Sequence, residues 1–393
     1  MQIDFHYYAT YCAAFLAGYS HEECMDICYS AQFVDLCTET FLSRLGAPLS
    51  AATTQLQLEL ADASSDIISL QNITRIWSSF HFLPGDLYAK KKGCSKRYLN
   101  KYRLICNPNG ELLVNTVKRA KNNSLQAVGI TMHVLADTWA HRYFAGTPSL
   151  VINNTDRYFF ELIPDGDRCF ERRITFKPNP SMTDNLNESI YVNSLYQNKE
   201  SSIMNLGHGR AGHLPDYSFI RYKYLPAWGD YDEIIKDNPS DYLHAFTQMI
   251  EAMKYLRGER EDFVADTYDF DAIAPYREKI EAIIKKRQLD SSRDWKAFGE
   301  KLSGCSIEFF NVNKYLKEYN MATPKEIDDT FIGRFIIAAL GQKSMVTNAI
   351  YKSGNRLAGF SVDYAQKGFK GIADYRKLLD QLRRADDDSL SKN

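Results

Sequence analysis

Residues 132–141 read Met-His-Val-Leu-Ala-Asp-Thr-Trp-Ala-His and repeat a metal-ligand residue type at every fourth position. They lie in the clearest helical stretch, residues 111–145, which Asn-Asn-Ser at 122–124 is expected to break into two helices. Each step of four residues rotates a helical side chain by only about 40°, so His133, Asp137 and His141 share one stripe. This stripe also faces apolar neighbours, which predicts a buried helix.

Two interpretations of the stripe are open. In the first, the two histidines and the aspartate form a buried polar network, which is costly unless something pairs those groups. In the second, they bind metal. His133 and His141 are about 12 Å apart along the helix, and one ion with bonds of about 2.1 Å does not reach both. The stripe therefore favours two or more ions bridged by Asp137, an arrangement typical of phosphoester hydrolysis.

A second group of candidate ligands lies in residues 207–216, Gly-His-Gly-Arg-Ala-Gly-His-Leu-Pro-Asp. The glycines allow the backbone to approach a site closely. His213 and Asp216 lie within one helical turn of each other, and His208 and Arg210 are near them in sequence. The alternative is a loop with incidental histidines.

Three further positions complete the candidate set. Asp4 and His6 would point the same way from an extended chain and hold one ion together. His81 stands between two phenylalanines, and Asp35 is an acid among apolar helical residues. Taken alone, each of these last two is more often a paired core group than a ligand.

The rest of the pattern predicts a mainly α fold. Residues 5–45, 50–80, 240–257 and 270 onward are expected to be helical. Ser20 and Glu23 form a capping-box pattern, and Asp241 is a plausible helix cap. Residues 147–205 predict an irregular insertion with short strands near 158–163 and 173–176. We expect a metal-binding domain at 1–260 and a C-terminal helical extension at 261–393, which offers a surface for a protein partner.

Composition excludes few classes of protein. The 393 residues carry 48 basic and 49 acidic side chains, so the global charge gives no sign of a polyanion binder. No apolar run approaches the roughly 20 residues of a membrane span, and no signal-peptide pattern is visible at the N-terminus. The expected location is the cytoplasm, or outside the cell without a cleaved leader. The eight cysteines show no Cys-x-x-Cys pair and are expected to be reduced.

In chain order, these residues resemble the zinc-dependent phospholipase C and single-strand nuclease superfamily, over residues 1–220 and most specifically at 133–141. The resemblance implies a helical bundle with three zinc ions at the base of a cleft. In the superfamily the mature N-terminus supplies an amine and a carbonyl, which Asp4 is expected to replace here. The implied ligands are Asp35, His81, His133 and Asp137 for one ion, Asp137, His6 and Asp4 for the second, and His141, Asp216 and either His213 or His208 for the third.

Two spacings depart from the superfamily. The interval from Asp137 to His141 is shorter than in the secreted phospholipases, and Asp216 follows His213 by three residues where the superfamily has four. The string from 207 to 216 is therefore more similar to an uncharacterised branch than to either known enzyme type.

The activity implied is phosphodiester hydrolysis by water bound to zinc. Asp35 would orient or deprotonate that water, and Arg210 would add positive charge. A phospholipid head group is favoured slightly over a nucleotide or single-stranded nucleic acid, because no basic stripe is visible. Two alternatives remain: an interaction module with structural metals, and a redox or oxygen-handling iron protein, since histidine and carboxylate ligands also suit iron. For the hydrolase itself, iron or manganese in place of zinc is also open.

Overall fold

The histidine stripe runs along helix α8 (Leu125–Ala140) to its C-cap, His141, and the helix is buried from Gln126 to Ala140 in the computed structural model. Ser124 caps this helix by accepting a hydrogen bond from the amide of Ala127. Helix α7 (Glu111–Ala120) precedes it, which confirms the predicted break. The structure describes residues 1–393 except 64–65, 167, 180–181, 194–201, 379 and 382–393.

Helix α2 (His21–Phe33) packs along α8 at very short range. A Cβ atom at Gly129 would lie 2.4 Å from the carbonyl oxygen of Ile27 and 2.5 Å from the side chain of Ser30. Only glycine permits this approach of the two backbones. The predicted capping box is present at the start of α2, where Ser20 and Glu23 bond each other's backbone.

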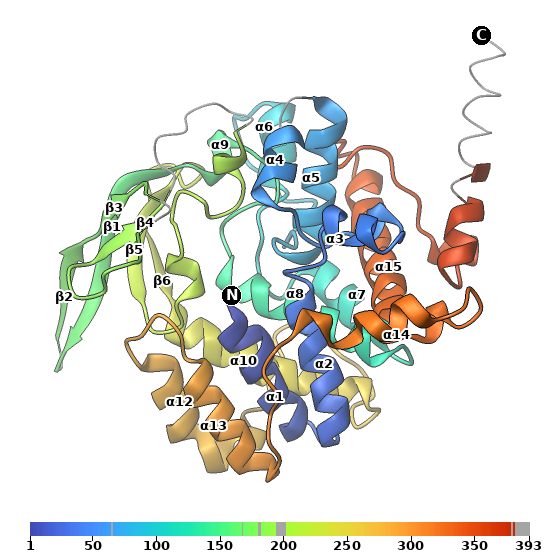
Figure 1. Cartoon of the computed structure of the whole chain (residues 1–393). Coiled ribbons are helices and arrows are strands. Elements are labelled where there is room, and N and C mark those ends of the chain that lie inside the picture. The colour runs from blue at the N-terminus through green and yellow to red at the C-terminus, as the bar shows by residue number, and fades with distance from the viewer. Residues whose placement is uncertain (64–65, 167, 180–181, 194–201, 379, 382–393) are drawn as a thin grey trace.

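The other helices surround this pair, and Figure 1 shows the N-terminus near the middle of the molecule. Residues 5–45 are less continuous than expected, because turns at 17–20 and 34–38 separate three α-helices. Asp237, and not Asp241, caps α10. Near the N-terminal end lie the π-helix η1 (Asp4–Ala9) and the 3₁₀-helix η2 (Leu49–Ala51). Among the described residues the remaining α-helices are α1 (Thr10–Leu16), α3 (Glu39–Arg44), α4 (Gln57–Ala63), α5 (Ile67–Phe80), α6 (Lys96–Tyr102), α9 (Leu150–Asn153), α10 (Asn238–Leu256), α11 (Phe270–Ile273), α12 (Arg277–Lys285), α13 (Ser292–Ser303), α14 (Leu316–Met321) and α15 (Phe331–Lys352).

The expectation of a mainly α bundle is wrong, since the molecule is a mixed α/β protein in which helices predominate. A four-stranded antiparallel sheet has the order β2-β1-β5-β6, and a parallel pair joins β3 to β4. The sheet projects from one side of the helices (Figure 1). Its strands are β1 (Thr155–Asp165), β2 (Arg168–Arg173), β5 (Arg221–Pro226) and β6 (Ile234–Asp237), while the pair consists of β3 (Thr175–Lys177) and β4 (Ile190–Val192).

The strand expected at 158–163 lies within β1, and that expected at 173–176 overlaps β3. The rest of the sheet was missed for a physical reason. The side chains of β2 are almost all exposed, so no alternation of polar and apolar residues marks it. In β5, buried Tyr222 and Tyr224 alternate with partly exposed residues, and this period of two is visible in the sequence. Tyr224 pairs with Phe159 of β1, which joins residues 155–165 to a strand beyond the predicted insertion.

The C-terminal helices share one hydrophobic core with the first 260 residues. This core extends from Met1 to Tyr375. Helix α15 packs against α5 and α8, and α13 packs against η1. Among the described residues, no helix is both long and apolar enough to cross a bilayer.

Candidate metal centre

Asp137 lies at the middle of the site and is only 1% exposed. Its Oδ1 is 2.8 Å from the amine of Met1 and 3.1 Å from Nε2 of His6. Its Oδ2 is 3.1 Å from Nε2 of His133 and 3.3 Å from Nδ1 of His81. Nitrogen atoms from η1, from α8 and from the end of α5 therefore converge on one carboxylate.

Asp35 approaches the same place from the turn that follows α2. Its Oδ1 is 3.8 Å from Nδ1 of His81 and 3.9 Å from Nε2 of His133. The Asp35 side chain is 30% exposed, whereas those of Asp137 and Asp216 are 1% and 8% exposed. Of the three carboxylates, Asp35 therefore lies on the side that solvent reaches.

A third carboxylate, Asp216, extends the cluster beyond the end of α8. Its Oδ1 is 3.2 Å from Nε2 of His141, 3.3 Å from the amine of Met1 and 3.7 Å from Nε2 of His208. His213 lies 3.2 Å from the other oxygen of Asp216 and its side chain is 57% exposed. The structure thus brings His208 beside His141, with His213 on the outer side of the carboxylate.

These side chains form three groups that can hold metal ions, within each of which the ligand atoms lie no more than 4.8 Å apart. Four ligands around zinc, with bonds near 2.05 Å, are about 3.3 Å from one another. Most of the distances above are close to that value. The groups are His6, His133 and Asp137; Asp35, His81 and His133; and His141, His208 and Asp216.

Four of the histidines are held by backbone carbonyl oxygens at one ring nitrogen. A neutral imidazole that donates one N–H carries a lone pair on the other nitrogen, and here that second nitrogen is directed into the cluster. This arrangement is typical of metal-binding histidines. The pairs are His133 Nδ1 with Ala31 at 2.9 Å, His141 Nδ1 with His81 at 2.8 Å, His208 Nδ1 with Gly212 at 2.7 Å and His81 Nε2 with Thr53 at 3.0 Å.

Burial keeps several of these histidines neutral. It lowers the pKa of His6 and of His208 to about 4, and it also lowers the pKa of His81. Burial would raise the pKa of Asp137, but His141, the Met1 amine and His133 outweigh it and hold that pKa well below its usual range. An ionised Asp137 therefore lies in one cluster with the neutral imidazoles of His6, His81 and His208.

Met1 and His6 carry unusual buried polar groups. Burial alone would lower the pKa of the Met1 amine, but Asp137 and Asp216 raise it to about 10. Both ring nitrogens of His6 are buried without a hydrogen-bond partner among the described residues, although Nε2 lies close to Asp137. A buried polar atom without a partner costs about 1–3 kcal/mol, so a ligand for His6 would stabilise the site.

Asp4 and His6 do not point the same way, contrary to the expectation for an extended chain. Residues 4–9 form a π-helix, in which positions two apart lie on nearly opposite sides. His6 faces Asp137, while Asp4 accepts hydrogen bonds from the hydroxyl and amide of Ser291 at 2.5 and 3.3 Å. The Met1 amine takes the place that was expected for Asp4. Met1 was not among the residues predicted from the sequence, although the superfamily's use of an N-terminal amine was a signal for it.

Arg210 is buried in the loop that carries His208. Its Nε donates a hydrogen bond to Oδ1 of Asn205 at 3.0 Å, and its carbonyl oxygen accepts one from Asn193. These bonds fix the loop at residues 205–212. That Arg210 adds positive charge to a reaction stays a prediction.

Comparison with known proteins gives one match. A protein-family model described as "Family of unknown function (DUF6765)" matches residues 1–350. No curated protein and no solved structure matches. The match extends over the metal centre and most of the C-terminal helices.

Proposed function

The chain belongs to the DUF6765 family, whose function is unknown, and we propose that it is a metal-dependent phosphodiester hydrolase. Within the centre, the proposal assigns two or three zinc ions to the groups around Asp35, Asp137 and Asp216. It rests on the chemistry of the donor atoms and on the resemblance to the phospholipase C and nuclease superfamily.

One observation carries the metal assignment: acceptor atoms face each other across short distances. His133 donates its Nδ1–H to Ala31, so its Nε2 presents a lone pair to Asp137 Oδ2 only 3.1 Å away. Nε2 of His141 likewise faces Asp216 at 3.2 Å. Two acceptors repel each other at this range unless a proton or a metal cation lies between them. A cation shared by several such pairs satisfies them all at once.

Each group supplies ligands that suit zinc, which binds nitrogen and carboxylate oxygen in sets of four. His133 and Asp137 belong with His81 and Asp35 at one position, and Asp137 also belongs with His6 at a second. His141, His208 and Asp216 form the third. The Met1 amine lies between the second and third positions, within 3.3 Å of both Asp137 and Asp216.

Bound zinc supplies a water of near-neutral pKa and neutralises phosphate oxygens. Asp35 is the residue of this chain best placed to accept a proton from a water molecule at the solvent-facing side. Its Oδ2 accepts a hydrogen bond from Gln32 at 3.3 Å, which fixes the orientation of the carboxylate. The buried carboxylates of Asp137 and Asp216 hold the centre together.

The experiment compares metal content and turnover in the wild-type chain and in Asp35→Asn. The substrate is bis-p-nitrophenyl phosphate, with phosphatidylcholine and single-stranded DNA as further arms. We expect Asp35→Asn to retain most of its zinc but to lose about 100-fold in kcat, since general-base catalysis is worth roughly that much. Asp232→Asn, an exposed aspartate near the sheet, is the matched control and should change neither quantity.

Bound zinc without turnover of any of these phosphoesters would favour structural metals and refute the proposal. Bound iron or manganese with turnover would retain the reaction and change the metal. Equal turnover in Asp35→Asn and the wild type would remove Asp35 from the proposed mechanism.

A further inference from the structure

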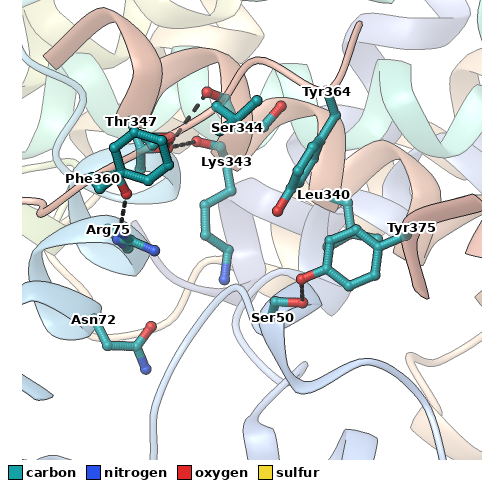
Figure 2. A pocket seen from close by; sticks show the side chains of 12 residues that line it. Ser50, Asn72, Arg75, Leu340, Lys343, Ser344, Thr347, Phe360, Tyr364 and Tyr375 are labelled. Atoms are coloured by element: carbon teal, nitrogen blue, oxygen red, sulfur yellow. Dashed lines mark hydrogen bonds between the residues drawn. The ribbon is translucent and has the colours of Figure 1, made fainter. Parts of the chain in front are cut away.

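A cavity of about 280 Å³ lies beside the segment 50–53, whose Ala52 carbonyl oxygen bonds Lys343 and whose Thr53 carbonyl oxygen bonds His81 of the metal centre. Figure 2 shows its walls, which come from α5, η2, α15 and the chain around residues 360–375. Two cationic side chains, Arg75 and Lys343, project into it from different helices. None of its lining residues is an acid.

Lys343 is a buried cation with a single neutral partner. Its side chain is 8% exposed, and Nζ donates one hydrogen bond, to the carbonyl oxygen of Ala52 at 2.6 Å. An ammonium group has three N–H donors, and no ion pair engages the other two within the described part of the chain. In Figure 2, Nζ points into the open space between Arg75 and Ser50. Burial lowers the pKa of Lys343 to about 7.

Arg75 faces the same space from α5. Its Nε donates to the carbonyl oxygen of Ala358 at 2.6 Å, and its Nη2 donates to that of Phe360. These bonds fix the plane of the guanidinium group. They use two of its five N–H donors, and no acid forms an ion pair with it among the residues that the structure describes.

Neutral donors complete the walls. The Tyr375 hydroxyl donates to Oγ of Ser50, so the hydrogen of Ser50 is left to donate elsewhere. The acids nearby line an adjoining cavity that shares Asn72 and Arg75; they are Glu39, Glu59 and Asp62. Glu39 accepts a hydrogen bond from the side-chain amide of Asn72 at 2.8 Å. Its charge raises the pKa of Lys343 against the larger effect of burial.

Lys343 is buried and Arg75 is half-buried. The two cations repel each other, and holding them in one cavity without a paired acid costs free energy. We propose that this cavity binds a phosphate-type oxyanion, either inorganic phosphate or the terminal group of a small phosphate monoester. The ammonium of Lys343 and the planar guanidinium of Arg75 are the donors that such anions prefer. A phosphate group fits within 280 Å³ together with ordered water.

This site is distinct from the metal centre and does not depend on its proposed activity. The two sites share no residue, but they meet at consecutive peptide units. Lys343 binds the carbonyl oxygen of Ala52, and His81 binds that of Thr53.

The test is a calorimetric titration of the full-length chain with inorganic phosphate, with glycerol phosphate and acetate as separate arms. Because phosphate also binds metal ions, the titration is repeated with Asp137→Asn, which we expect to lose the metal centre. Lys343→Met removes the charge at similar volume. We expect Asp137→Asn to bind one phosphate per chain, and Lys343→Met, in that background, to bind it at least about tenfold more weakly, since a charged hydrogen bond contributes about 1.5–3 kcal/mol.

Arg75→Gln in the same background is the second variant and should weaken phosphate to a similar extent. Tighter binding of glycerol phosphate than of phosphate would identify a monoester as the ligand, and the reverse would identify the free ion. Undiminished phosphate binding after both Lys343→Met and Arg75→Gln would overturn the proposal. So would the absence of phosphate binding to Asp137→Asn, provided that its circular dichroism spectrum is native, and so would binding of acetate as tight as that of phosphate.

Discussion

The metal centre and the cavity around Lys343 and Arg75 present opposite chemistry, although they meet at the consecutive peptide units of Ala52 and Thr53. In the metal centre, ionised carboxylates and imidazole lone pairs converge, and the Met1 amine lies among them. In the cavity, an ammonium and a guanidinium group have only backbone carbonyl partners. In each case the protein leaves buried charge of one sign without full compensation. The sign that is left over indicates the sign of the ligand.

The largest expected effect is the loss of metal from Asp137→Asn. The neutral amide removes the negative charge that His6, His81 and His133 all approach, so every ion that shares this residue loses a ligand. We expect most of the bound metal to be lost, and affinity to fall at least about 100-fold. Elemental analysis of the purified chain measures this.

His244→Ala is the control for the metal measurement. His244 is half-buried, stacks on Trp139 and lies outside all three groups, so its replacement should leave the metal content unchanged. Equal metal content in Asp137→Asn and wild type would show that the Asp137 carboxylate does not hold a metal ion. The contrast between a cation-binding centre and an anion-binding cavity would then fail.

The next largest effect concerns the buried cation Lys343 and the pH dependence of the free energy of unfolding. Below pH 7, Lys343 is protonated in both the folded and unfolded chain, so the full cost of its burial is present. As pH rises from 7 towards 10.5, the folded chain releases this proton first and the cost disappears. Lys343→Met should therefore raise the free energy of unfolding by a few kcal/mol at pH 6 in phosphate-free buffer, and by much less near pH 10.

Chemical denaturation at both pH values gives this difference. Glu39 and Arg75 act on Lys343 in opposite directions, so Glu39→Gln should enlarge the stabilisation that Lys343→Met brings at pH 6. A stabilisation by Lys343→Met that does not vary with pH would show that the ammonium group is already hydrated in the folded chain.

The smallest expected effect is a difference in metal binding between variants of two histidines near Asp216. His208→Ala should remove one ion per chain, because its Nε2 belongs to the third group. His213→Ala should retain that ion with an affinity lowered by about tenfold or less, as expected for a residue that only orients a ligand. Metal titration of both variants measures the difference. Retention of the third ion by His208→Ala together with its loss from His213→Ala would reverse the assignment.

The sequence predicted the metal centre far better than the second cavity. His133, Asp137 and His141 recur at a helical interval, and histidine is scarce in this chain, so their pattern stands out. Lys343, Arg75 and Ser50 are common residue types that are separated by up to 293 positions. Nothing in their local sequence distinguishes them from solvated surface residues. The expectation that Asp4 and His6 face the same way was wrong, because it assumed an extended chain where the structure has a π-helix.

The fold was predicted where a helix has a buried stripe and clear ends, as at α7, α8 and α10. It was not predicted where strands are recognised only by their partners. The exposed residues of β2 carry no periodic signal, and β1 pairs with β5 across more than fifty residues. Pairing between strands that are distant in the sequence cannot be predicted from the propensities and local pattern of either strand.

Gly129 binds nothing, yet it determines how the chemistry at the centre is assembled. Its missing side chain allows α2 and α8 to touch, and one turn further along α8 His133 reaches the carbonyl oxygen of Ala31 at the end of α2. The position of His133 within the ligand set therefore depends on a residue that is not a ligand, because a side chain larger than hydrogen at position 129 would force α2 and α8 apart. An engineer who wished to widen or retune this centre would begin at the helix contact and leave the ligands untouched.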